Sequence, residues 1–212
     1  MISDLLVTPL MSINYIGLVA SKPPFDDPLV RKAFLLATDR QQLVADIYGD
    51  SRELANGFLP PGLPGHNAFI KGSGFDPVEA RRLLRNSSYG GPEGLPDIVY
   101  ITTGFSEPSA VVSAILTMWR TNLNIDVQAT LIRDAYYYAL PLALDIANIY
   151  DYGWIADYPD PHNFLDVLFH SNADNNVGGY SNAEVDTLLE QARTEQQAAT
   201  RLELYEEVEK IL

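Results

Sequence analysis

Segments typical of buried strands alternate with amphipathic helical segments along most of this 212-residue chain. The strand segments are rich in β-branched and aromatic residues and cover residues 13–19, 97–103, 125–132 and 146–154. The helical segments begin after Asp27, Asp39 and Asp76, and then cover residues 109–123, 134–142, 181–193 and 200–212. Two of them open with Asp-Pro, in which the carboxylate caps free N–H groups and proline favours the first helical turn. This alternation predicts an α/β lobe.

The charge of the chain is strongly negative. It contains 28 acidic and 14 basic residues, which gives a formal net charge of -14. Nucleic-acid binding requires clustered lysine and arginine, and an anionic membrane surface would repel the protein. The composition therefore argues against both partners and suits a cationic or zwitterionic small ligand.

Cysteine is absent, so the chain has no disulfide, thiolate nucleophile or cysteine-based metal site. No apolar run approaches the roughly 20 residues that span a bilayer. The amino terminus lacks the basic region and cleavage site of a signal peptide, so we expect any targeting segment to lie upstream. The last helical segment reaches the final residue without a stop signal, as expected for one part of a larger protein.

Signatures of an enzyme are missing. The three histidines are too scattered for a metal-ligand pair at helical spacing, and neither a nucleophile elbow nor a phosphate-binding glycine loop occurs. Asp157, Asp160 and Asp166 could in principle form a carboxylate pair or a calcium site, but prolines interrupt them and EF-hand spacing is absent. The sequence predicts no catalytic residue, metal site or cofactor.

The segment 151–161 is the richest candidate for a binding site. A strand that ends near Trp154 places an aromatic wall beside a loop that carries Asp157. The candidate ligand-binding residues of this segment are Gly153, Trp154, Ala156, Asp157 and Tyr158. In the alternative interpretation, Asp157 caps a turn and Trp154 fills the core. Asp160 precedes a proline, which favours turn formation.

A second candidate surface lies at residues 175–180. Asn175 and Asn176 offer hydrogen-bond donors and acceptors to a peptide main chain, and the following glycines permit close approach of a ligand. A loop before a helix capped by Ser181 explains the same residues. The tyrosines at 136–138 could line a pocket, although core packing is the favoured interpretation.

A series of motifs occurs in a characteristic order: residues 15–18 (YIGL), 24–34 (PFDDPLVRKAF), 37–40 (ATDR), 57–62 (GFLPPG), 75–84 (FDPVEARRLL), 153–161 (GWIADYPDP), 179–186 (GYSNAEVD) and 201–206 (RLELYE). The series resembles the family 5 solute-binding proteins of ABC importers, which include oligopeptide- and dipeptide-binding proteins. The resemblance implies a periplasmic-binding-protein-like lobe of type II, peptide-binding class, with a mixed sheet flanked by helices. Residues 1–12 would be a remnant of the preceding lobe and hinge, and residues 13–212 the C-terminal ligand-binding lobe.

The resemblance also implies a role for Asp157. In the family, the aspartate of a Trp-x-Ala-Asp motif accepts the α-ammonium group of a bound peptide. Asp151 departs from the pattern, because some relatives have a basic residue there that helps to hold the ligand carboxylate. Relatives of this lobe bind nickel chelates, sugars or opines, so the solute class stays open between peptides and other small solutes.

The resemblance implies three partners: a peptide or other small solute, an ABC permease in the membrane, and the missing N-terminal lobe of the same chain. It implies an extracytoplasmic location, in the periplasm or on the outer face of the cytoplasmic membrane as a lipoprotein. Two alternatives remain. One is the solute-sensing domain of a transcriptional regulator, and the other is a hydrolase with an acidic site.

Overall fold

A mixed sheet organises the fold. The computed structural model describes residues 8–104, 106–132 and 145–212. Within them the sheet order is β1-β4-β2-β3, where β1 and β4 are antiparallel and β2 is parallel to both β3 and β4. The strands are β1 (Ser12–Leu18), β2 (Val99–Thr103), β3 (Gln128–Ile132) and β4 (Ile149–Ile155). The predicted α/β class with a mixed sheet is confirmed.

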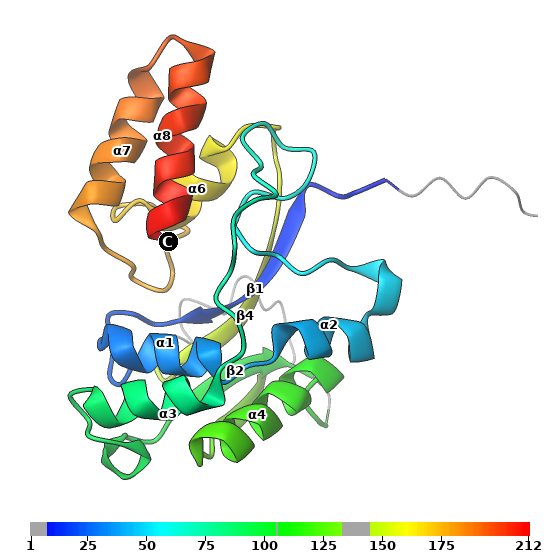
Figure 1. Cartoon of the computed structure of the whole chain (residues 1–212), viewed down its shortest axis with the longest axis vertical. Coiled ribbons are helices and arrows are strands. Elements are labelled where there is room, and N and C mark those ends of the chain that lie inside the picture. The colour runs from blue at the N-terminus through cyan, green and yellow to red at the C-terminus, as the bar shows by residue number, and fades with distance from the viewer. Residues whose placement is uncertain (1–7, 105, 133–144) are drawn as a thin grey trace, which may run out of the picture.

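Helices lie in two groups around this sheet (Figure 1). The first group lies beside strand β2. It contains α1 (Pro28–Leu36), α2 (Arg40–Ile47), α3 (Pro77–Asn86) and α4 (Ala110–Leu123). The second group forms a separate bundle at the other end of β1 and β4, with α6 (His162–Phe169), α7 (Ala183–Thr194) and α8 (Ala198–Ile211). Short 3-10 turns occur at Gly49–Ser51 and Pro92–Gly94. No described helix has the length and apolar character that crossing a membrane requires.

Each helix group covers its own hydrophobic core. In the first core the ring of Phe34 meets those of Phe25 and Trp119 edge-on, each at 5.0 Å between centroids. The indole of Trp119 donates to Thr38 Oγ1 at 2.9 Å, which satisfies a buried polar group. The second core contains Phe164 from α6 and Tyr205 from α8, both completely buried.

Strand β1 connects the two cores because its side chains alternate between the faces of the sheet. Ile13 belongs to the second core, whereas Ile16 and Leu18 pack against the first. On the face of Ile13, the ring of Tyr150 lies over Gly17, where a Cβ atom would come within 2.1 Å of Tyr150 Cζ. Burial of this tyrosine raises its pKa. A side chain at position 17 would therefore force the Tyr150 ring to move.

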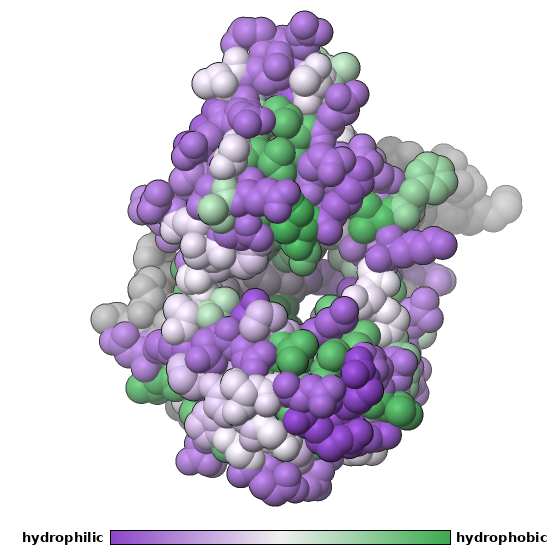
Figure 2. Space-filling model, turned by 60° about the vertical axis from the view of Figure 1, so that its left-hand side comes forward, coloured by the Kyte–Doolittle hydropathy of each residue, from purple (hydrophilic) through white to green (hydrophobic). Residues whose placement is uncertain are grey.

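The surface shown in Figure 2 is mostly hydrophilic. Hydrophilic residues dominate the face in Figure 2, and apolar side chains gather in a narrow strip on the upper part, where Figure 1 places α7 and α8. This distribution is normal for a protein in contact with water.

Most predicted helix starts agree with the structure. Asp27, Asp39, Asp76 and Ser109 each accept a backbone N–H at the N-cap position. The cap of α7 is Asn182, so the prediction of a cap at Ser181 was wrong by one residue. Helix α6 was missed, because the loop-like Asp-Pro sequence before it obscured a segment of eight residues. The helix predicted at 134–142, together with the tyrosines at 136–138, lies outside the described residues.

Candidate functional site

The short connection from β4 to α6 carries the predicted binding residues. Trp154 is the penultimate residue of β4 and packs against the second core, with its ring 6.5 Å from that of Tyr152. Asp157 follows three residues later and is exposed to solvent. The structure therefore brings the predicted indole and carboxylate to the same end of the sheet.

A buried amide connects these two residues. Asn163, in the first turn of α6, is 2% exposed. Its Oδ1 accepts hydrogen bonds from Trp154 Nε1 and from the backbone N–H of Asp157, both at 3.0 Å. Its Nδ2 donates to Asp157 Oδ2 at 3.3 Å. Asn163 was not among the predicted site residues; its one signal in the sequence is that it is an amide in a mostly apolar helix.

Tyr158 points toward the helix that follows it. Its hydroxyl forms a hydrogen bond of 2.7 Å with His162 Nδ1, and the two rings lie 6.1 Å apart. Tyr158 is still 42% exposed, so part of its aromatic ring is in contact with solvent.

Asp160 ties the loop to the carboxy-terminal helix. Its two carboxylate oxygens each accept a hydrogen bond of 2.8 Å from Arg201 on α8, and its Oδ1 also accepts from the His162 N–H. The turn role predicted for Asp160 agrees with this geometry. Arg201 is additionally bonded to the hydroxyl of Tyr205 at 3.0 Å, so both ends of the ion pair are fixed.

The ion pair predicts how the protein responds to acid. The hydrogen bonds from Arg201 lower the pKa of Asp160 below its ordinary value of 3.8. A carboxyl group with a lowered folded-state pKa stabilises the fold above its unfolded-state pKa, and this contribution disappears as the pH falls through the folded-state value. We expect Asp160→Asn to lower the melting temperature at neutral pH and to weaken the loss of stability below pH 3.8. Thermal unfolding as a function of pH measures this, and equal acid sensitivity of both proteins would contradict it.

Gly153 and Ala156 shape the end of the strand through their backbones. A Cβ atom on Gly153 would lie 2.8 Å from Asn14 Oδ1 on the neighbouring strand. The N–H of Ala156 donates to Met11 O at 2.9 Å, which extends the β1–β4 ladder by one step. The bond of Ala156 therefore keeps the chain paired with β1 up to the residue before Asp157.

Asp151 lies within the sheet, away from that loop. It pairs in register with Ile16 of β1 and is half-buried. Burial raises its pKa, an effect that hydrogen bonds with Thr102 and Tyr100 only partly offset. The residue that departs from the family pattern is therefore part of a polar contact between β4 and β2.

The second predicted surface has a different geometry. Asn176 Nδ2 donates to His170 O at 3.2 Å and to Tyr180 O at 2.6 Å, while its Oδ1 accepts from the Tyr180 N–H at 3.0 Å. Its amide closes the loop internally, and a ligand contact by Asn176 stays a prediction. Asn175 lines an open hollow of about 510 Å³ on the bundle.

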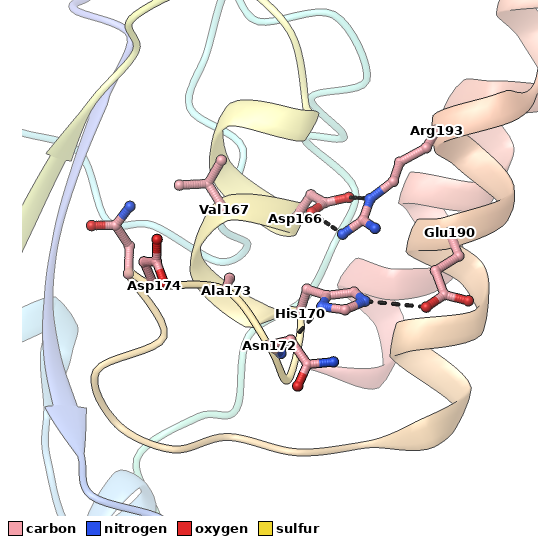
Figure 3. Close-up of a pocket in the computed structure, with 9 residues that line it drawn as sticks. Asp166, Val167, His170, Asn172, Ala173, Asp174, Glu190 and Arg193 are labelled. Carbon is pink, nitrogen blue, oxygen red and sulfur yellow. Dashed lines mark hydrogen bonds and ion pairs between the residues drawn. The ribbon is translucent and has the colours of Figure 1, made fainter.

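An ion pair and a hydrogen bond between side chains occupy this hollow (Figure 3). Asp166 on α6 faces Arg193 on α7, with two hydrogen bonds of 2.7 and 2.8 Å. Nearby, His170 lies 3.4 Å from Glu190. These pairs hold α6 against α7, and no cluster of metal-ligating side chains occurs among the described residues. Asp157 lines neither this hollow nor a smaller one beside Arg40.

Comparisons with known proteins agree on one family. The sequence model of the bacterial extracellular solute-binding proteins, family 5, middle region, matches residues 3–176. The oligopeptide-binding protein OppA of Bacillus subtilis is 26% identical over 97% of this chain. The probable deoxycholate-binding periplasmic protein YgiS of Escherichia coli is 29% identical over 99% of it. The chain spans only 38% and 39% of the lengths of these two relatives.

A solved structure shows the same fold. The periplasmic binding protein DppA of Helicobacter pylori, in complex with the peptide STSA, superposes on 94% of this chain with a TM-score of 0.84 and 26% identity. The matched region is 39% of that protein. The fold therefore agrees with the prediction of a lobe of the peptide-binding class.

Proposed function

Since this chain belongs to family 5 of the bacterial extracellular solute-binding proteins, we propose that it is the C-terminal ligand-binding lobe of a receptor for an ABC importer. Residues 13–212 would form the lobe, and residues 1–12 would come from the hinge and the preceding lobe. The ligand would be a peptide or a similar small solute. This receptor would act outside the cytoplasm and deliver the solute to a membrane permease without making or breaking a bond.

One observation carries the proposal: an exposed carboxylate is fixed beside an indole at the end of a central strand. Asp157 and Trp154 both bond to the same buried amide, so their relative position is set before any ligand arrives. Within the described residues Asp157 takes part in no ion pair, and its charge is available to a ligand. A carboxylate and an ammonium group form a short, charge-assisted hydrogen bond, and an indole face adds cation–π attraction.

The mechanism that fits this site is closure of two lobes on the ligand. A hinge movement would bring the missing lobe over the Asp157 loop and remove water from the contact. Because this lobe supplies only part of the contacts, we expect the 212-residue chain alone to bind weakly. The net charge of -14 favours solutes that carry a positive group.

Native mass spectrometry of the full-length protein, purified without denaturation, tests the receptor function. We expect bound molecules that leave when the protein unfolds and that carry a free amino group. Added tri-alanine should replace them. A protein that carries no bound molecule and takes up no tri-alanine would contradict binding of peptides.

A further inference from the structure

Asn163 contacts both residues that the proposed function needs. It lies in the first turn of α6, directly after the loop that carries Asp157, and only 2% of its surface is exposed. Neighbouring Phe164 and Leu165 are completely buried in the second core. The amide therefore extends from a rigid helix, and its position is set by core packing.

The bonding of this amide is specific for asparagine. An asparagine side chain offers two acceptor lone pairs and two donor hydrogens. Both lone pairs are used, one by the Trp154 indole and one by the Asp157 backbone, and one donor reaches the Asp157 carboxylate. An ionised aspartate at this position could not donate, and a leucine of similar size could neither donate nor accept. A buried indole N–H or backbone N–H that loses its acceptor costs free energy.

Two further contacts hold the loop on either side of this amide. Asp160 is bonded to Arg201 through both carboxylate oxygens, and Tyr158 is bonded to His162. These contacts fix where the loop runs. Among the described side chains, the amide of Asn163 is the group that hydrogen-bonds to the carboxylate of Asp157 itself.

We propose that Asn163 is the positioning residue of the ligand site: one buried amide holds the Asp157 carboxylate and the Trp154 indole together, oriented toward a positive group of the ligand. The inference rests on the proposed function. We therefore expect that replacing Asn163 reduces the preference of the protein for ligands with a free amino group, in addition to any effect on stability.

The first test needs no ligand. In nitrogen-edited proton spectra of the full-length protein, the indole N–H signals of Trp154 and Trp119 are assigned with Trp→Phe variants. Asn163→Leu should move the Trp154 signal, because its acceptor is gone, and leave the Trp119 signal in place, because its bond to Thr38 is remote. Asn163→Asp keeps an acceptor and should leave the Trp154 signal close to that of the wild type. An unmoved Trp154 signal in Asn163→Leu would overturn the inference.

The second test measures affinity by calorimetry with tri-alanine and with N-acetyl-tri-alanine, which lacks the ammonium group. Asn163→Leu should bind tri-alanine about tenfold more weakly, the scale of one hydrogen bond to a charged group. Binding of the acetylated peptide should change little. An equal loss for both peptides, or no loss, would assign Asn163 a purely structural role and overturn the proposal.

Asn148→Leu is the matched control. The Asn148 side-chain amide likewise both accepts and donates: it accepts from Val99 N and donates to Pro23 O, at the opposite end of β4. This variant should lower stability and leave both the Trp154 signal and the preference for the free amino group unchanged. If the wild type binds neither peptide, the proposed peptide-binding function fails. The spectra then still decide whether Asn163 holds Trp154.

Discussion

Replacing Glu209 by alanine is expected to lower the free energy of unfolding by about 3 kcal/mol, because it leaves two backbone donors without an acceptor at about 1–3 kcal/mol each. Glu209 lies on α8 and is 7% exposed. Its Oε1 accepts the N–H groups of Phe58 and Leu59 at 2.7 and 2.9 Å. Urea unfolding at pH 7 measures the effect. A loss below about 0.5 kcal/mol, the range of ordinary surface substitutions, would contradict it.

Glu209→Gln is the control, because the amide keeps an acceptor at the same place. Burial raises the pKa of Glu209, and the two N–H groups only partly oppose this. A carboxyl group with a raised folded-state pKa stabilises the fold below its unfolded-state pKa, and this contribution is lost as the pH rises through the folded-state value. The glutamine variant should therefore be as stable as the wild type at pH 7 and lack this pH dependence.

Replacing Asp157 by alanine in the full-length protein should weaken binding of a ligand with a free amino group by at least about 2 kcal/mol, or about 30-fold. The loss arises because the ammonium group keeps its desolvation cost and no longer has a charged partner. Calorimetry with tri-alanine measures it. Unchanged affinity would remove Asp157 from the proposed role.

A matched variant separates this contact from the general effect of net charge. Asp46 is exposed on α2, far along the chain from the Asp157 loop. Asp46→Ala changes the net charge by the same amount and should leave the affinity within about twofold, since an exposed charge that does not contact the ligand is weakened by water and salt. An equal loss in both variants would point to long-range electrostatics in place of a direct contact.

Local signals explain what the sequence predicted of the fold. The caps at Asp27 and Asp76 follow from Asp-Pro pairs, in which both residues favour a helix start. Strand β4 was recognisable from its apolar and aromatic residues, and the structure places it at Ile149–Ile155. Such features depend on a few neighbouring residues, so a single sequence reveals them.

The parts that were missed depend on tertiary packing. Glu209 bonds to Phe58 across 151 positions, and no local pattern links an acidic helix residue to a distant loop. Asn163 is close to Asp157 in sequence, but its inward orientation depends on α6 packing against the second core. The sequence predicted Asp157 and Trp154 as ligand-binding residues, and the family resemblance predicted that Asp157 binds the ammonium group of a peptide. Neither indicated the amide that joins them.

A thermodynamic cycle tests whether the Asp157 carboxylate contacts the amino group of the ligand. Four affinities are measured by calorimetry with the full-length protein: wild type and Asp157→Ala, each with tri-alanine and with N-acetyl-tri-alanine. If the Asp157 carboxylate binds the amino group of the peptide, acetylation of the peptide should weaken binding strongly in the wild type and little in the variant. The coupling energy between the carboxylate and the amino group should then be at least about 1.5 kcal/mol. A coupling energy near zero would show that the two groups do not meet.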